Sequence, residues 1–337
     1  MKLTPANIII SRTDSIGDVV LTLPLAAVLK QHFPQARIAF IGRAYTRPVI
    51  EACKYVDAFI DKEAFLHGPV TVCGQTPDTI LHVLPDAAIA FRARQLGIRR
   101  RVGTTNRLYH WVTCNRLVLL GRRRSQLHEA QLNLKLLKAF GIDSFFSLQE
   151  IGLLYGLERL KPLPPAMAGL IAKNKYNLIL HPKSQGNGRE WGLNNFIQLI
   201  RLLDNNHYQV FISGTQKERL LIQPLFDAAG HKVTDITGMM SLDEFITFIA
   251  GCDGLVASGT GPLHLAAALG KDAMGIFPPI RPVHPGRWAP LGPQARVFVI
   301  NKSCSDCRDN DSACHCIADV SPLLVKEALD KQQIKTR

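Results

Sequence analysis

A glycine-containing turn between an apolar strand and an apolar helix constrains the fold of this chain more than any other stretch. Residues 251–256 predict a short buried strand, and residues 257–270 continue as Ala-Ser-Gly-Thr-Gly-Pro-Leu-His-Leu-Ala-Ala-Ala-Leu-Gly. The run from Leu265 to Leu269 is apolar on every side, and Gly270 suits a helix C-cap. Glycines allow a ligand to approach closely, and the unpaired N–H groups that begin a helix favour a phosphate. The turn is therefore either a phosphate cradle or a simple connection between two core elements.

The same succession of elements occurs in both halves of the chain. In the first half, apolar patterning predicts strands at 7–11, 36–42, 58–60, 70–72, 79–83 and 102–103, and helices at 19–30 and 126–140. In the second half, it predicts strands at 177–181, 209–213 and 251–256, and helices at 193–203, 242–249 and 265–269. This spacing is typical of βαβ units, so we expect an α/β fold with two doubly wound domains.

Prolines mark the expected boundary between these domains. Residues 158–166, Glu-Arg-Leu-Lys-Pro-Leu-Pro-Pro-Ala, form a stiff segment. We therefore place the first domain at 1–165 and the second at 166–317. The last amphipathic stretch, 320–332, predicts a C-terminal helix within 318–337, which we expect to cross back toward the first domain.

The composition describes a soluble globular protein. The chain has 337 residues, of which 47% are hydrophobic and 20% charged, enough to build two domains with proper cores. No run approaches the roughly 20 apolar residues that a membrane span needs. The amino-terminal residues lack a cleavage site of small residues and predict a first strand rather than a signal peptide.

Positive charge is concentrated in the first half. Residues 1–165 contain 22 Lys and Arg against 12 Asp and Glu, so they hold 10 of the 13 net positive charges. Candidate partners are nucleic acid, an anionic membrane face and a phosphorylated substrate, and the alternative is a well-solvated basic surface. The arginines responsible are Arg92, Arg94, Arg99, Arg100, Arg101, Arg107, Arg116, Arg122, Arg123 and Arg124.

Three loops follow strands at the edge where open α/β sheets bind ligands, namely 11–18, 182–191 and 258–264. Asp14 is the better helix cap in the first loop, which leaves Asp18 as the better general base. Arg189 offers a cation to a phosphate, although it is equally suited to an exposed loop. Thr260 and the N–H groups after it offer a cradle for a diphosphate.

Other chemistries fit the motifs less well. Gly270-Lys271 is followed by Asp272, so it does not complete a phosphate-loop motif. Neither Gly-x-Gly pair continues as a dinucleotide-binding motif, and no Gly-x-Ser-x-Gly elbow of a serine hydrolase occurs. The basic region also lacks a recognised aromatic stacking platform, which argues against nucleic acid as partner.

Taken together, the three loops resemble glycosyltransferase family 9, the heptosyltransferases of lipopolysaccharide core synthesis. Residues 11–24, Ser-Arg-Thr-Asp-Ser-Ile-Gly-Asp-Val-Val-Leu-Thr-Leu-Pro, resemble its amino-terminal signature. Residues 181–191 are similar to its second-domain phosphate loop, and residues 258–270 to its third motif. The resemblance spans roughly residues 7–300. It implies a GT-B fold with two Rossmann-like domains facing a central cleft, and an inverting transfer from a nucleotide-diphosphate sugar that needs no metal or other cofactor.

The resemblance also implies roles for individual residues. Asp18 matches the family's general base, and Arg189 falls where the family usually has a lysine that contacts donor phosphate; arginine can do this with two hydrogen bonds. Gly259 stands where the family usually has an aspartate that contacts the donor sugar, so a nucleotide-sugar other than ADP-heptose stays open. The other implied donor-binding residues are Ser184 in the phosphate loop, Glu218 for the ribose, Met240 for the base, and Thr260, Gly261, Pro262 and His264 for the diphosphate.

The basic first half fits an anionic lipid-linked glycan acceptor. The protein would then be cytoplasmic and peripheral on the inner face of the cytoplasmic membrane, held there by electrostatic attraction. We predict that Arg99, Arg100 and Arg101 contact the acceptor or the membrane, or else form a solvated loop. The alternative function is a non-catalytic protein that binds a nucleotide-sugar or a glycan at a degenerate transferase site.

Four of the eight cysteines form a cluster near the carboxyl terminus. Cys304, Cys307, Cys314 and Cys316 follow the pattern Cys-x2-Cys-x6-Cys-x-Cys. In a cytosolic protein, such spacing is more typical of metal binding than of disulfides, and four thiolates suit a closed, structural zinc site. The tight Cys-x-Cys end is less usual for zinc, so free thiols remain the alternative.

Overall fold

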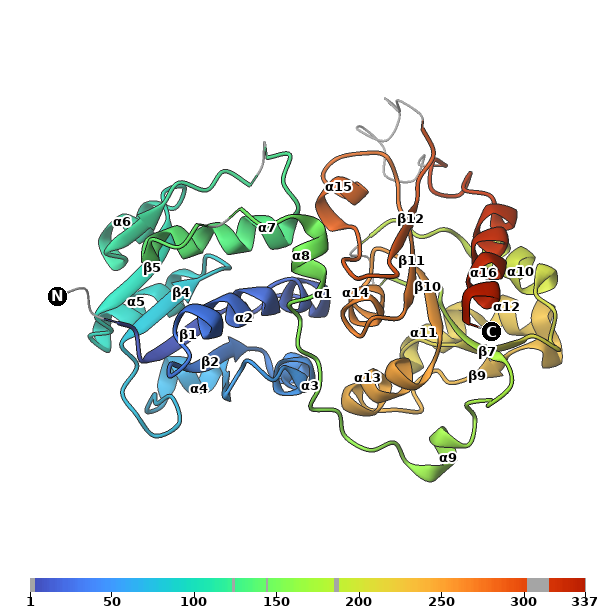
Figure 1. Ribbon diagram of the computed structural model, residues 1–337, viewed down its shortest axis with the longest axis horizontal. Coiled ribbons are helices and arrows are strands. Elements are labelled where there is room, and N and C mark those ends of the chain that lie inside the picture. Colours follow the sequence, from blue (N-terminus) through green and yellow to red (C-terminus); the bar gives the residue numbers. More distant parts are fainter. Residues whose placement is uncertain (1–3, 123–124, 144, 185–187, 302–314, 337) are drawn as a thin grey trace. The chain divides into compact units, whose positions relative to one another are not determined.

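The computed structural model describes residues 4–122, 125–143, 145–184, 188–301 and 315–336. The chain divides into two compact units, residues 1–160 and 161–337 (Figure 1). Each unit is built around one six-stranded sheet. The predicted doubly wound α/β fold is confirmed.

The sheet of the first unit is parallel throughout, and its strands lie in the order β3-β2-β1-β4-β5-β6. Its centre is fully buried, since Ile8, Ile9 and Ile10 of β1 have no exposed surface. A continuous apolar run of this kind is what a parallel strand covered on both faces requires. The strands are β1 (Asn7–Ser11), β2 (Arg37–Gly42), β3 (Ala58–Asp61), β4 (Thr79–His82), β5 (Arg100–Thr104) and β6 (Arg116–Val118).

The sheet of the second unit repeats this arrangement, with the order β12-β11-β10-β7-β8-β9 and parallel pairing. Counted within each unit, both sheets therefore run third, second, first, fourth, fifth, sixth. The strands are added first on one side of the first strand and then on the other, and such folds bind ligands at the point where this order reverses. The strands are β7 (Tyr176–His181), β8 (Tyr208–Ile212), β9 (Thr234–Asp235), β10 (Gly254–Ser258), β11 (Asp272–Ile276) and β12 (Arg296–Phe298).

Helices connect the strands in both units (Figure 1). Those of the first unit are α1 (Ile16–Val20), α2 (Leu23–His32), α3 (Arg47–Ala52), α4 (Lys62–His67), α5 (Ala87–Gln95), α6 (Leu108–Thr113), α7 (Glu129–Leu134) and α8 (Leu148–Gly152), with 3₁₀ turns at η1 (Ala44–Thr46) and η2 (Lys135–Phe140). Those of the second unit are α9 (Pro165–Ala168), α10 (Leu193–Leu202), α11 (Gln216–Leu221), α12 (Gln223–Ala229), α13 (Leu242–Gly251), α14 (Gly261–Ala268), α15 (Pro285–Trp288) and α16 (Pro322–Thr336), with a 3₁₀ turn at η3 (Gly230–Lys232).

Two predicted helices are divided in the structure. The helix predicted at 19–30 is α1 followed by α2, because Pro24 lacks an N–H and fits the first turn of a new helix better than a helix interior. The helix predicted at 126–140 is α7 continued by the 3₁₀ turn η2, which ends at Gly141 in the left-handed conformation.

The strand predicted at 70–72 does not join the sheet. Val72 and Gln75 instead exchange two backbone hydrogen bonds, of 2.8 and 3.0 Å, across a tight turn. Cys73 and Gly74 in this turn both have positive φ, of 48° and 80°. The residues therefore form an isolated bridge, and β6, β9, β11 and β12 are strands that the sequence patterning missed.

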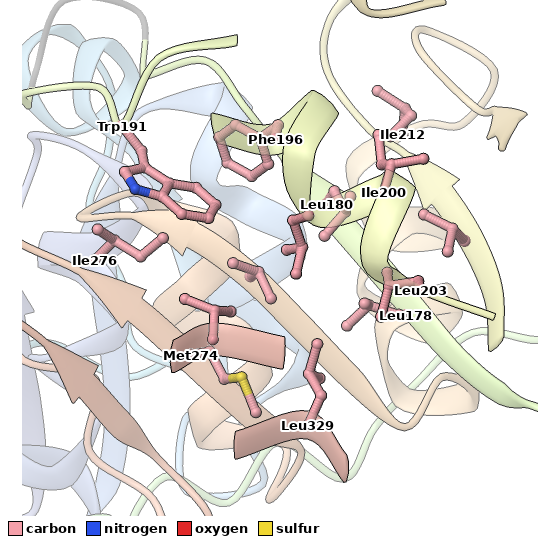
Figure 2. Packing of buried hydrophobic residues seen from close by; sticks show 14 of the residues in the cluster. Leu178, Leu180, Trp191, Phe196, Ile200, Leu203, Ile212, Met274, Ile276 and Leu329 are labelled. Carbon is pink, nitrogen blue, oxygen red and sulfur yellow. The ribbon is translucent and has the colours of Figure 1, made fainter. Parts of the chain in front are cut away.

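The core of the second unit includes the C-terminal helix. Figure 2 shows Leu329 of α16 in the same apolar cluster as Leu178, Met274 and Trp191. The indole Nε1–H of Trp191 also donates to the carbonyl of Val320, at 2.8 Å. Val325 and Leu329 of α16 are thus buried in the core of the second unit, whereas Leu323 and Leu324 are exposed. The predicted return of this helix to the first domain stays a prediction.

No helix among the described residues is both long and apolar enough to cross a membrane.

Candidate active site

Asp18 lies just after the carboxyl end of β1, beside the point where the first sheet reverses direction. Both of its carboxylate oxygens are engaged: Oδ1 accepts from the guanidinium of Arg12, and Oδ2 accepts from the hydroxyl of Ser15 at 2.6 Å. Its side chain keeps 16% of its surface exposed. The carboxylate is therefore oriented by two donors while it remains accessible to a substrate.

Asp14 does not cap the helix as predicted. Ser15 occupies the N-cap position, and Asp14 accepts from Arg12 Nε at 2.7 Å. Burial raises the pKa of Asp14, and the neighbouring charge of Asp18 adds to this effect, while Arg12 opposes it.

Arg12 is the centre of a buried charge network that the sequence patterning did not identify. Besides Asp14 and Asp18, its guanidinium contacts Glu129 Oε1 at 3.1 Å. Burial alone would lower the pKa of Arg12, but the charges of the three carboxylates outweigh burial and raise it. Arg12 is therefore permanently charged and holds Asp18 in place.

Helix α7 supplies the rest of this network. Glu129 is almost fully buried and also pairs with Arg122. Arg122 donates to the side-chain oxygen of Asn133 at 3.1 Å, and Asn133 donates to the carbonyl of Leu21 at the same distance. The network thus ties α7 to the end of α1, where Asp18 lies.

Arg99, Arg100 and Arg101 lie elsewhere in the first unit. Arg100 opens β5, so these residues sit at the amino edge of the sheet, opposite Asp18. Arg101 Nε donates to the carbonyl of Thr113 at 2.6 Å, and Arg100 lies over the ring of Phe140. The structure does not bring them together with Asp18, and their contact with a membrane stays a prediction.

In the second unit, the loops after β7 and β10 lie against each other at the equivalent point of the sheet. A Cβ built on Gly188 would lie 3.3 Å from the carbonyl oxygen of Gly259. Arg189, the next residue, is therefore adjacent to the turn that opens α14. The Ser184 hydroxyl donates to the carbonyl of Gly188 at 2.9 Å, a hydrogen bond within this loop.

The amino terminus of α14 carries polar atoms that lack protein partners among the described residues. Thr260 is the N-cap, but its side chain makes no capping hydrogen bond and its Oγ1 is buried without a partner. His264, one turn later, has a buried Nδ1 in the same situation. Burial lowers the pKa of His264 to about 4, so the imidazole is neutral near pH 7. Gly261 and Pro262 are the first two residues of α14.

Glu218 has one oxygen engaged and one unsatisfied. Its Oε2 accepts from the backbone N–H of Thr215 at 2.7 Å and forms a capping box at the start of α11. Its Oε1 is buried and has no hydrogen-bond partner in the described part of the chain. Gly238 N–H donates to the carbonyl of Gly214 at 2.9 Å, which brings the loop before the half-buried Met240 close to Glu218.

Buried polar groups are usually paired, so three unsatisfied atoms, two at the start of α14 and one in the first turn of α11, are candidates for hydrogen bonds with a polar ligand. The helix dipole and free N–H groups at α14 favour an anionic group there. The oxygen of Glu218 is an acceptor suited to a hydroxyl. This set of groups matches a molecule with both phosphate and sugar hydroxyls.

Gly259 is packed tightly against Phe277. A Cβ on Gly259 would lie 2.9 Å from Cε1 of this ring, and Phe277 is only 1% exposed. Any side chain at 259 would therefore require the buried ring to move.

Of the predicted zinc ligands, Cys304, Cys307 and Cys314 lie outside the described residues. Cys316 is described and buried. Within the described ranges, no group of three or more His, Cys, Asp and Glu side chains could hold a metal ion. The zinc site stays a prediction.

Comparison with known proteins places these observations in one family. The sequence profile of glycosyltransferase family 9 (heptosyltransferase) matches residues 138–318, more than half of the chain. The lipopolysaccharide core heptosyltransferase OpsX of Haemophilus influenzae is 22% identical over 298 residues, which cover 81% of this chain and 79% of that protein.

Solved structures share the fold over nearly the whole chain. The ADP-heptose lipopolysaccharide heptosyltransferase II of E. coli superposes with a TM-score of 0.74 at 18% identity, covering 98% of this chain and 99% of its own. A family 9 glycosyl transferase of Veillonella parvula superposes with a TM-score of 0.77 at 16% identity, with 99% of each chain covered. The two units therefore have the GT-B type of fold found in these proteins.

Proposed function

This chain belongs to glycosyltransferase family 9, and we propose that it is an inverting enzyme that moves a heptose-like sugar from a nucleotide-diphosphate sugar to a lipopolysaccharide core or a related envelope glycan. The observation that carries the proposal is the set of unsatisfied buried atoms of Thr260, His264 and Glu218 in the second unit. A carboxylate oriented for base catalysis in the first unit accompanies it.

In the proposed reaction, the acceptor hydroxyl transfers its proton to Asp18 as its oxygen attacks the anomeric carbon of the donor. The bond between this carbon and the diphosphate breaks, and the nucleoside diphosphate leaves with the electron pair. Attack from the face opposite the leaving group inverts the anomeric configuration. General base catalysis of this kind contributes roughly 10²- to 10⁴-fold.

The leaving diphosphate gains negative charge, and we assign its stabilisation to the N–H groups at the start of α14 and to Arg189. Preorganised donors aimed at developing charge are among the largest contributions to catalysis. The role of Ser184 is to hold the loop that carries Arg189, since its hydroxyl donates within that loop. The transfer as proposed requires no metal, and the predicted zinc of the cysteine cluster would be structural.

For the rest of the donor, Glu218 supplies an acceptor for a ribose hydroxyl, and the segment at Met240 contacts the base. Solved family members include the E. coli enzyme named for ADP-heptose, which makes an adenine nucleotide the first candidate. Because Gly259 and Phe277 leave no side chain at 259 to contact the sugar, the sugar itself is the part of the donor most open to difference.

The acceptor we propose is an anionic lipid-linked glycan, and the enzyme would act at the cytoplasmic face of the inner membrane. The basic excess of residues 1–165 supports this proposal, since anionic surfaces attract clustered arginines. Relatives such as OpsX are named for lipopolysaccharide core synthesis.

A thermal-shift panel tests the donor first. ADP, UDP, GDP, CMP and their sugar conjugates would each be added to the full chain, because a ligand that binds only the folded state raises its melting temperature. We expect a shift with one nucleotide series only, and the matching sugar conjugate should then release nucleoside diphosphate in the presence of acceptor. NMR of the product should show an inverted anomeric centre. Absence of any shift would contradict the donor site.

The same panel separates the alternative of a non-catalytic binding protein. A chain that binds a nucleotide-sugar but releases no nucleoside diphosphate with any lipopolysaccharide-derived acceptor would support that alternative. The complete network around Asp18 favours the enzyme, since a protein that only binds has no need of a carboxylate oriented by two donors.

A further inference from the structure

Helix α6 of the first unit exposes apolar side chains that a soluble protein would normally bury. Leu108, Trp111 and Val112 are 89%, 61% and 56% exposed, and Leu119, just after β6, is 83% exposed. We call these four residues the α6 surface. The three on the helix are spaced i, i+3 and i+4, so they form one face.

This face is held outward by fixed contacts. Trp111 Nε1–H donates to the carbonyl of Thr105 at 3.0 Å, and Thr105 N–H donates to the carbonyl of Val118 at 3.1 Å. These two bonds link Trp111 through Thr105 to the end of β6, which Leu119 follows. The opposite side of the helix is anchored by His110 and Thr113, which are fully buried.

Arginines secure the carboxyl end of the same helix. Arg94 donates to the carbonyl of Val112 at 2.7 Å, and Arg101 donates to the carbonyl of Thr113 at 2.6 Å. Cations at a helix carboxyl terminus complement its dipole. The exposed face is therefore part of a rigid element.

The stretch of sequence that contains this surface is rich in arginine. Residues 87–128 contain ten arginines and no aspartate or glutamate. Arg107 directly precedes Leu108 and is exposed, and so is Arg94, which reaches the carboxyl end of the helix. Arg99 and Arg116 are also exposed, but they lie toward the amino edge of the sheet, near Asp78. An exposed apolar face with a tryptophan, flanked by arginines, matches the interface of an anionic bilayer, where the apolar groups enter the headgroup region and the arginines meet lipid phosphates.

We infer that the α6 surface docks this protein on an anionic lipid membrane. The inference rests on the proposed acceptor, since a lipid-linked glycan is held at such a membrane, and it adds the surface by which the enzyme reaches it. Thr105 and Leu119 follow the carboxyl ends of β5 and β6. In the sheet order, β6 is three strands from β1, roughly 14 Å at the usual strand spacing. Docking would thus hold the edge that carries Asp18 near the headgroups.

Flotation with lipid vesicles tests the inference on the full chain. The vesicles are phosphatidylcholine with or without phosphatidylglycerol, and binding is expected only when the anionic lipid is present. Leu108→Ser/Leu119→Ser should lower partitioning about tenfold or more, because two leucines no longer leave water. Arg107→Gln/Arg116→Gln should lower it about fivefold for each arginine at low salt, and its remaining binding should depend less on salt.

Matched controls come from the second unit. Leu220→Ser/Leu221→Ser changes two leucines that are 77% and 60% exposed, and Arg201→Gln removes an exposed arginine. Both controls should bind vesicles like the wild type. The emission of Trp111 should also shift to the blue on anionic vesicles, and Trp111→Phe should remove this shift while the buried Trp191 stays unchanged.

Several results would overturn the inference. The α6 variants could bind anionic vesicles as well as the wild type does. Light scattering could instead show that the wild type is an oligomer and that Leu108→Ser/Leu119→Ser is a monomer, which would make the surface a contact between copies. Binding of a short RNA, lost in the arginine variant while vesicles are never bound, would assign the surface to nucleic acid.

Binding of ADP separates this inference from the proposed function. The thermal shift with ADP should be unchanged in the α6 variants, because none of these residues lies in the donor site. If the protein binds anionic vesicles through α6 but binds no nucleotide, the membrane inference is supported and the transferase proposal is contradicted. A chain that binds ADP but no vesicles would contradict the membrane surface alone.

Discussion

The two units share one strand order but differ in how their ligand-binding edges are filled. In the first unit, the charged groups at this edge are paired with one another, with Arg12 at the centre of three carboxylates. In the second unit, the equivalent edge holds Thr260, His264 and Glu218, each with a buried polar atom that lacks a partner among the described residues.

This difference corresponds to two functions, proton transfer in the first unit and binding of a charged ligand in the second. A group that must take a proton needs a fixed orientation before the substrate arrives, which the paired network supplies. A site that must hold a charged ligand needs unsatisfied donors and acceptors, which cost stability until the ligand binds. The same topology thus supports a preassembled group of charges around Asp18 and an open set of polar atoms at α14 and α11. The contrast concerns these groups alone, since Ser11 and His82 of the first unit also have buried polar atoms without a described partner, and Lys183 pairs with Glu190 in the second unit.

The largest expected effect is on turnover. Asp18→Asn removes the proposed base but keeps its shape, so kcat should fall by about 10³-fold while the thermal shift with donor nucleotide is unchanged. Asp14→Asn is the matched control, since it also removes one carboxylate from Arg12, and it should cost far less rate. Near-normal turnover in Asp18→Asn would show that Asp18 is not the base.

Removing one charge from the paired network around Asp18 should lower the stability of the protein more than removing an exposed charge. Arg12→Met leaves Asp14, Asp18 and the buried Glu129 without their shared cation, and breaking such a network costs about 3 to 5 kcal/mol. Urea unfolding measures this loss. Arg201→Met, at an exposed position, should change stability little. Equal stabilities of the two variants would remove the basis for calling the group of charges around Asp18 preassembled.

Acid should weaken the first unit through His82. Burial, with a smaller contribution from His110, lowers the pKa of His82 to about 3. The unfolded chain takes up this proton first as pH falls below about 6.5, so the stabilisation is complete above that pH and is lost progressively toward pH 3, by about 2 kcal/mol at pH 5. Asp86 and Arg101 also act on this histidine, in opposite directions.

His82→Leu should flatten this pH dependence, since both ring nitrogens of His82 lack partners among the described residues. His67→Leu, at an exposed histidine, serves as control. Unfolding free energies at pH 7 and pH 5 make the comparison, and an unchanged slope in His82→Leu would show that this residue does not carry the acid sensitivity.

Because Gly259 packs closely against Phe277, a side chain added at 259 should overpack this part of the core. Gly259→Ala places a Cβ 2.9 Å from the ring and should cost about 1 to 2 kcal/mol. Gly121→Ala, where nothing lies within 4 Å, is the control. In Gly259→Ala/Phe277→Leu, the added cost of the alanine should largely disappear. Full additivity of the two changes would argue against a direct contact.

The smallest predicted effect is that of a change at Thr260, which should leave stability equal or higher while it lowers the affinity for the ligand. Thr260→Val removes a buried hydroxyl without a described partner, so the free protein should be equally stable or up to about 1 kcal/mol more stable. Nucleotide-diphosphate affinity should fall about tenfold, because the ligand loses that hydrogen bond. Melting temperature and titration calorimetry measure the two effects. Loss of stability with unchanged affinity would make Thr260 a structural residue.

Much of this organisation is predictable from the chain. Continuous apolar runs such as 7–11 and 177–181 predict buried parallel strands, and the loops that follow them carry Asp18 and Arg189. Short edge strands escape prediction, because β9 has only two residues and β12 only three. Their pairing comes from the neighbouring strand rather than from their own side chains.

The details of the candidate site depend on contacts that local patterns do not contain. Arg12 and Glu129 are 117 positions apart, so their pairing follows from the fold of the whole unit. The same is true of Thr260 and Glu218, because only the folded structure shows that no described residue forms a hydrogen bond with their buried oxygens. Sequence patterning therefore identifies the loops, while the three-dimensional arrangement decides which polar groups are used and which are open.

The packing of Gly259 against Phe277 also bears on how such a site changes over evolutionary time. A side chain acquired at 259 before Phe277 changes would pass through a crowded, less stable protein. Loss of the ring first would leave a cavity, which also costs stability. Neither substitution is neutral alone, so we expect the glycine and the phenylalanine to be inherited as a pair. A lineage that holds them would gain a side chain at 259 only through a less stable intermediate.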